Sequence, residues 1–98
     1  LPLTVEFTGG LEMLFSHRRT HTISLPAPQP PTVAHLITWL CTHLLRDPRR
    51  ELFVLDDGTI RPGILVLVND ADWELEGHER WVLAAGDRVV FVSTLHGG

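Results

Sequence analysis

Alternating apolar and polar positions open the chain and predict a strand. Leu3, Val5 and Phe7 alternate with polar neighbours, which is the period of a strand with one buried face. Gly9-Gly10 then breaks the run and indicates a turn. Two apolar residues alternate again further on, so we expect a second strand over residues 20–25 that forms a hairpin with the first.

A helix is predicted after a proline-rich connector. Prolines at positions 26, 28, 30 and 31 prevent regular pairing, and Thr32 then occupies a position suited to a helix N-cap. The following apolar residues recur at helical spacing, which predicts an amphipathic helix that ends near Arg46 and Asp47, before Pro48. These residues are Val33, Leu36, Ile37, Leu40, Leu44 and Leu45. The first half of this helix should cover one face of a sheet.

The second half of the chain predicts further strands separated by turns. We expect a short strand over Leu52–Leu55 and a turn at residues 56–58. Residues 64–68 are continuously apolar and predict a buried strand before a turn at 69–70. After a turn at 86–87, residues 88–95 form the last predicted strand. Its apolar centre lacks alternation, so both of its faces should be covered, as in the middle of a sheet.

The order of these elements predicts an α+β fold. One helix should pack on one face of a mixed sheet, with the last strand beside the first, which is the β-grasp arrangement of ubiquitin-like proteins. We expect residues 1–98 to form a single domain of this kind, with a flexible C-terminal tail at residues 96–98.

Composition excludes several classes of function. The 98 residues carry a net charge of −4, which argues against direct binding of nucleic acid. No apolar stretch approaches the roughly 20 residues that span a bilayer, and no targeting peptide is evident. The single cysteine, Cys41, fits a reducing cytoplasm. All eight basic residues are arginine, so the chain cannot accept a modifier on a lysine of its own.

The terminal pair Gly97-Gly98 is the strongest chemical signal in the sequence. Glycine has no side chain to obstruct a narrow catalytic channel, and a terminal carboxylate can be activated and transferred. Such a tail suits a protein that is itself a substrate. Gly9-Gly10 has a purely structural interpretation, so the dipeptide alone does not establish this function.

Long motifs across the chain resemble the ubiquitin-related modifier family. They are residues 61–75 (RPGILVLVNDADWEL) and 92–98 (VSTLHGG), supported by residues 5–7 and 9–12 and by residues 51–53. Glu76 departs from the family pattern, where an apolar residue is expected before Gly77. The proline-rich connector and the loop at Asp56 are also idiosyncratic.

The resemblance implies a sulfur carrier and protein modifier rather than an enzyme. It implies that an activating enzyme uses ATP to adenylate Gly98, and that a rhodanese-type persulfide converts the adenylate to a thiocarboxylate. It implies no bound cofactor. The sulfur would then go to the wobble uridine of tRNA through a thiolation enzyme, and Gly98 could also be joined to lysines of target proteins, with peroxiredoxin as one candidate. The tail residues that the activating enzyme would recognise are Gly97, His96, Leu95 and Thr94. We expect a monomer.

Two other functions remain open at this stage. The chain could be a ubiquitin-like interaction module that is never activated, or a small subunit that donates sulfur to a cofactor synthase. For partner docking, we expect an exposed part of the sheet, with Leu11, Phe15 and Leu65 as candidates.

The remaining chemical side chains favour structural roles. His17 and His21 are four apart on a presumed strand but lack a third ligand nearby, so a zinc site is not expected. His35 and His43 should lie at the surface or at its boundary with the core, and Cys41 should be a packed small hydrophobe.

An acidic turn follows the strand predicted at residues 64–68. Asp70, Asp72 and Glu74 resemble the start of a calcium loop, but the positions that require glycine and glutamate hold Leu75 and Trp81. A carboxylate-rich turn is therefore expected, with Trp73 buried beside it.

Overall fold

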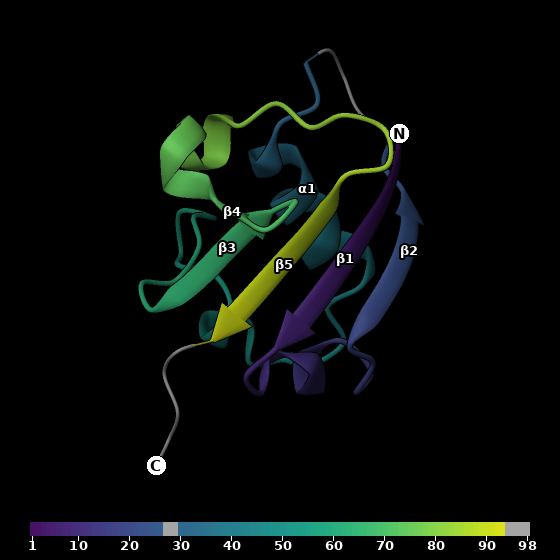
Figure 1. Cartoon of the computed structure of the whole chain (residues 1–98). Helices are drawn as coiled ribbons and strands as arrows, with labels where there is room; N and C mark the ends of the chain where they lie inside the picture. The colour runs from purple at the N-terminus through teal and green to yellow at the C-terminus, as the bar shows by residue number, and fades with distance from the viewer. Residues whose placement is uncertain (27–29, 94–98) are drawn as a thin grey trace.

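A mixed sheet and one crossing helix form the structure. The computed structural model describes residues 1–26 and 30–93. Within them, five strands are arranged in the order β2-β1-β5-β3-β4, and α1 crosses behind the sheet in Figure 1. The strands are β1 (Pro2–Thr8), β2 (Thr20–Ser24), β3 (Ile64–Val68), β4 (Ala71–Asp72) and β5 (Arg88–Ser93), and the helix is α1 (Val33–His43). The predicted α+β β-grasp architecture is confirmed.

Strand β5 lies at the centre of the sheet, as predicted. It pairs in parallel with β1, with Val5 opposite Val89 and Phe7 opposite Phe91, and antiparallel with β3 on its other side. The prediction that both faces are covered holds only in part. Val90, on the face away from α1, is 8% exposed, but Val92 on the same face is half-buried.

The core lies between the sheet and α1. The inward residues of β1 are Leu3, Val5 and Phe7, and all three are buried. Leu36 and Leu40 of α1 are fully buried in the same apolar cluster. The alternation in β1 and the helical spacing in α1 therefore place their apolar side chains on a shared interface, whose burial drives the packing of the two layers.

Helix α1 begins where the sequence predicts and ends earlier. The hydroxyl of Thr32 accepts a hydrogen bond from the backbone N–H of His35, which confirms the N-cap. The regular helix ends at His43, however, rather than near Arg46. The N–H groups of Leu44 and Leu45 both bond to the carbonyl of Leu40, and the N–H of Arg46 bonds to the carbonyl of Leu14 instead of continuing the helix. Periodicity did not reveal this competing partner.

The segment around the expected short strand 52–55 differs from the prediction. Residues Arg50–Leu52 form a 3₁₀ turn, η2, and only Val54 makes a β-bridge, to Ile60. Strand β3 is present as predicted, but it is buried on one face only, since Leu65 and Leu67 are half-buried. Its apolar sequence gives no sign of this alternation.

The structure defines further short elements, whose types and bounds were not predicted. They are β4 and three 3₁₀ turns: η1 (Leu11–Leu14), η3 (Trp73–Glu76) and η4 (His78–Arg80). The turn before β4 is confirmed, and both of its residues, Asn69 and Asp70, have positive φ, as a tight hairpin requires. Such elements are too short to show a period.

In residues 1–26 and 30–93, no helix is long and apolar enough to cross a membrane.

Candidate functional site

The candidate tail follows the carboxyl end of β5 in the sequence. Ser93 is the last described residue of that strand and lies opposite Ile64 of β3. In Figure 1, this end of β5 lies at the same edge of the sheet as the loop that follows β1. The candidate reactive residue Gly98 and the candidate recognition residues Gly97, His96, Leu95 and Thr94 lie outside the described residues, as does the expected tail at 96–98.

The sheet face away from α1 carries a partly exposed apolar strip next to the carboxyl end of β5. Leu65 lies opposite Val92, and Leu67 lies opposite Val90. Leu65, Leu67 and Val92 are all partly accessible to solvent. Of the three docking candidates from the sequence, Leu65 is thus the one whose side chain a partner can reach.

Leu11 and Phe15 cannot serve as docking residues in the folded chain. Leu11 is 4% exposed and Phe15 is fully buried. The Phe15 ring stacks on that of Phe7, with ring centroids 3.7 Å apart, and also meets Phe53 edge to face. The run from Leu11 to Phe15 closes the core below the β1–β2 hairpin. Its apolar character therefore reflects packing, a distinction that the local pattern did not make.

An ion pair that the sequence did not reveal lies on the same sheet face as Leu65. The guanidinium of Arg88 donates to the carboxylate of Glu6 over 2.6 Å, and the Thr20 hydroxyl lies 3.5 Å from the same carboxylate oxygen. Glu6 is 8% exposed. The hydrogen bond from Arg88 lowers the pKa of Glu6, although burial opposes this effect. Only the parallel pairing of β1 with β5 brings the two residues together.

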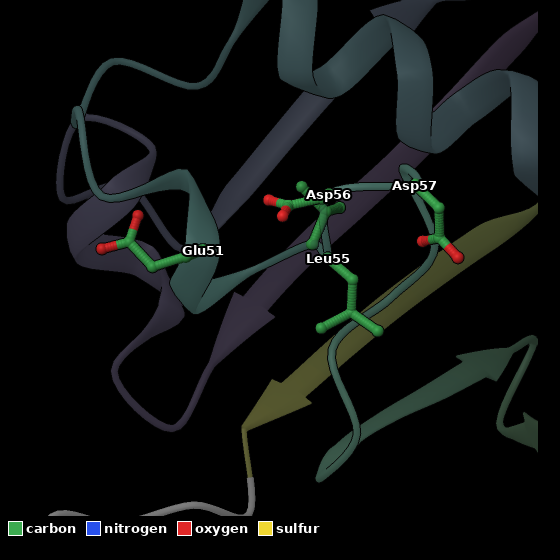
Figure 2. A pocket seen from close by; sticks show the side chains of 5 residues that line it. Glu51, Leu55, Asp56 and Asp57 are labelled. Atoms are coloured by element: carbon green, nitrogen blue, oxygen red, sulfur yellow. The ribbon is translucent and has the colours of Figure 1, made fainter.

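A shallow cavity of about 420 Å³ lies beside η2, but its carboxylates do not form a binding centre. Glu51, Leu55, Asp56 and Asp57 are strung along its rim in Figure 2. Asp57 accepts hydrogen bonds from the N–H and hydroxyl of Thr59, which lower its pKa. Within residues 1–26 and 30–93, no three acidic, histidine or cysteine side chains are grouped closely enough to hold a metal ion.

Cys41 is half-buried and packs against the core. Burial raises the pKa of its thiol, while the nearby Arg50 charge opposes the rise. A less acidic thiol supplies less thiolate at neutral pH and is therefore less reactive. The expected packing role is supported, although the side chain is not fully enclosed.

The histidines of the hairpin do not share a strand face. His17 is exposed in the turn before β2, with φ of 56°, and only His21 belongs to the strand. His21 is 7% exposed, and its Nε2 lies 3.0 Å from the carbonyl oxygen of Arg18. His35 and His43 are exposed, as predicted.

The acidic turn and its tryptophan behave as predicted. Trp73 is 7% exposed and belongs to the core. The Asp72 side chain accepts from the N–H of Glu74 and so caps η3. Gly77 ends η3 with a φ of 88°, and Glu76 before it is exposed. The departure at Glu76 therefore leaves the core intact.

Comparison with known proteins gives full-length matches. The family model described as Urm1 (Ubiquitin related modifier) matches residues 2–98. Ubiquitin-related modifier 1 of Coccidioides immitis is 61% identical over all of this chain and 88% of its own length. The protein of the same name from Chaetomium thermophilum is 59% identical over all of this chain and 92% of its own length.

Solved structures agree with these matches. The solution structure of Urm1 from Trypanosoma brucei aligns with a TM-score of 0.84 and 42% identity, covering 99% of this chain and 95% of that one. The crystal structure of SAMP1 from Haloferax volcanii aligns over the whole of both chains with a TM-score of 0.77. At 21% identity, the second likeness shows the shared fold alone.

Proposed function

Since the chain belongs to the ubiquitin-related modifier (Urm1) family, we propose that it acts through the carboxylate of Gly98. As a family member, it is a ubiquitin-like modifier and sulfur carrier, and it is a co-substrate rather than an enzyme. The observation that carries the proposal is the family match, which extends through residue 98. The role of Gly98 itself rests on the chemistry of a terminal carboxylate.

The proposed activation proceeds in three steps. ATP converts the carboxylate of Gly98 to an acyl adenylate and releases pyrophosphate. A persulfide sulfur of the activating enzyme attacks the acyl carbon and displaces AMP, which gives an acyl disulfide. A second thiolate then attacks the enzyme-side sulfur, forms a disulfide with it and leaves the thiocarboxylate on Gly98. No side chain of the modifier needs to exchange a proton in these steps.

The modifier contributes a docking surface and a tail that enters the enzyme. We propose that Leu65 and its neighbours Leu67 and Val92 form part of this surface, because they are accessible and lie beside the end of β5. Residues 94–97 would be recognised on the way to Gly98. Apolar contacts by the strip would offset part of the free-energy cost of ordering the tail residues in the complex.

Family membership implies activating and conjugating partners, and we propose which kinds of protein these partners are. The activating enzyme would carry a rhodanese-type persulfide, a thiolation enzyme would pass the sulfur to the tRNA wobble uridine, and target lysines would include those of peroxiredoxin. The chain would itself be a cytoplasmic monomer that meets RNA only through its partner, which agrees with its net charge of −4.

The first experiment is intact-mass measurement after incubation with the activating enzyme, ATP and a persulfide donor. Replacing one terminal oxygen by sulfur adds about 16 Da, which coincides with oxidation of one methionine. Met13 is 48% exposed, so Met13→Leu serves as a background that cannot gain this mass by methionine oxidation. A gain that requires ATP and disappears on deletion of Gly98 is expected. Equal gain in the shortened chain would exclude Gly98 as the reactive residue.

The same preparation separates the alternatives. An interaction module would show no ATP-dependent reaction with a competent enzyme. A synthase subunit would bind its large partner stably and transfer sulfur neither to tRNA nor to lysine. Because this chain has no lysine, any isopeptide conjugate that it forms with a target must use a lysine of the target.

A further inference from the structure

Gly9 lies closely against the residue from which the tail departs. It directly follows β1 and has a φ of 71°. A Cβ atom added to Gly9 would lie 2.3 Å from the carbonyl oxygen of Ser93, 3.1 Å from its N and 3.2 Å from its carbonyl carbon. A separation below about 3 Å is shorter than carbon and oxygen tolerate without a bond, since their favourable contact distances are near 3.5 Å. Only glycine leaves room for Ser93 in its present position.

Other glycines with positive φ do not have this steric requirement. Added Cβ atoms at Gly10, Gly58 and Gly86 would each meet nothing within 4 Å. Their φ values are 101°, 86° and 85°, so they need glycine for backbone conformation alone. Gly10 is adjacent to Gly9 in the same turn. Comparing the two glycines therefore separates the effect of the contact with Ser93 from the cost of a side chain at positive φ.

The atoms that Gly9 approaches belong to the backbone. A flexible side chain could rotate away from a new methyl group, but the peptide of Ser93 can move only with the end of β5. On the other side of that strand, Ser93 lies opposite Ile64 of β3. The parallel pairing of β1 with β5 places Thr8 opposite Val92, one residue earlier. Ser93 is therefore confined on the β1 side by Gly9 and on the β3 side by Ile64.

We infer that Gly9 is a positioning residue for the reaction at the C-terminus. Its missing side chain lets the end of β5 lie against the β1 turn, and this fixes the position and orientation of the Ser93 peptide that precedes the tail. The inference rests on the proposed function, because this orientation matters only if the tail must enter the activating enzyme while the domain is docked. A displacement of about 1 Å at a reacting group can lower a rate about a hundredfold.

The test compares Gly9→Ala with Gly10→Ala in activation by the enzyme. Both variants place an L-residue at positive φ, and both are assayed at a temperature where circular dichroism shows them folded. For Gly9→Ala, we expect kcat of ATP–pyrophosphate exchange to fall by about tenfold to a hundredfold, as for a misplaced reacting group. The Kd of the docked domain should stay within about twofold, since the sheet face is unchanged. Gly10→Ala should retain kcat close to that of the unsubstituted chain.

A third variant distinguishes the contact from general loss of stability. D-alanine at position 9 accepts positive φ and directs its methyl group away from the place that an L-residue would fill. It can be introduced by ligating a synthetic 1–40 fragment to residues 41–98 at Cys41, the only cysteine in the chain. We expect this variant to recover kcat. The NMR shift of the Ser93 amide should change in Gly9→Ala and return in the D-alanine chain.

Several results would overturn the inference. Normal kcat in Gly9→Ala, or equal losses in Gly9→Ala and Gly10→Ala, would make Gly9 an ordinary turn residue. Failure of D-alanine to restore kcat in a folded chain would exclude the steric contact as the cause. If the unsubstituted chain is not activated, the proposed function fails as well, whereas activation of that chain with normal Gly9→Ala overturns this inference alone.

Discussion

The guanidinium of Arg88 and the carboxylate of Glu6 join β5 to β1 through a 2.6 Å hydrogen bond on the open face of the sheet. Glu6 lies opposite Val90 in the register, so the bond runs diagonally between the strands. The side chain of Glu6 is 10% exposed and that of Arg88 is 51% exposed. Arg88 therefore keeps a nearly buried carboxylate ionised while remaining in contact with water.

This pair should make stability depend on acid pH. Because Arg88 lowers the pKa of Glu6 in the folded chain, the unfolded chain binds a proton at this carboxylate more readily. The contribution of the ion pair to the free energy of unfolding is therefore complete at pH values above the ordinary pKa of 4.5. Stability should fall as pH decreases through the lowered pKa. Glu6→Gln should reduce that slope, and urea unfolding between pH 6 and about pH 3 measures it. A slope equal to that of the unsubstituted chain would contradict the role of Glu6.

Removal of Arg88 should be more damaging than its exposure suggests. Arg88→Ala leaves the buried Glu6 carboxylate without its cation, and we expect a loss of about 1 kcal/mol at neutral pH. Arg80→Ala is the control, since Arg80 is exposed and makes no ion pair among the described residues. The double change of Glu6→Gln with Arg88→Ala should recover part of the loss. Equal unfolding midpoints for the two arginine variants would argue against the pair.

Two leucines of similar appearance in the sequence should respond differently to truncation. Leu11→Ala removes a buried side chain and should destabilise the fold by about 2–5 kcal/mol. Leu65 is partly exposed, so Leu65→Ala should cost less than about 1.5 kcal/mol. In the activation assay, Leu65→Ala should raise KM because it weakens the proposed docking strip. Denaturant unfolding and enzyme kinetics on both variants separate packing from docking. A normal KM for Leu65→Ala would remove Leu65 from the docking surface.

The cap of α1 offers a local measure of helix stability. Thr32→Ala removes the acceptor for the N–H of His35 and should cost about 1 kcal/mol. Thr38→Ala is the matched control, because Thr38 lies exposed within the same helix and alanine is the better helix former. Thermal unfolding should therefore rank Thr32→Ala below both the control and the unsubstituted chain. Equal melting temperatures for the two variants would contradict the cap.

The thiol of Cys41 should react slowly at neutral pH. Burial raises its pKa, so the alkylation rate should continue to rise with pH beyond the range in which a free cysteine reaches its plateau. Iodoacetamide labelling followed by mass spectrometry measures this profile. The chain unfolded in urea provides the reference for an unburied thiol. Coincident profiles for the folded and unfolded chains would contradict the effect of burial.

Sequence patterns predict the elements whose periodic pattern extends over many residues. They fail where an element depends on a contact between residues far apart in the chain. The alternation of β1 and the spacing of α1 extend over enough residues to identify both elements and their buried faces. The end of α1 is decided by a bond from Arg46 to Leu14, more than thirty positions away, and local spacing contains no information about it.

The docking candidates show the same limit. Leu11 and Phe15 are apolar and adjacent to a turn, as exposed docking residues also can be, but both are buried in the folded chain, Phe15 in a stack with Phe7. The pairing of Glu6 with Arg88 depends on two strands more than eighty residues apart. The proposed reactive end, in contrast, is a property of the sequence itself, since Gly97-Gly98 needs no packing to be recognised.

The central place of β5 also bears on how the chain folds during synthesis. β5 is the last of the described strands along the chain, yet it lies between β1 and β3. Until β5 joins them, the β1–β2 and β3–β4 pairs have no strand to connect them into one sheet. Pairing Val5 with Val89 closes one of the longest loops available to the chain, which makes this step slow relative to formation of the hairpin or the helix. The strand that precedes the tail therefore completes the fold, and presentation of the tail to an enzyme becomes coupled to successful folding of the whole domain.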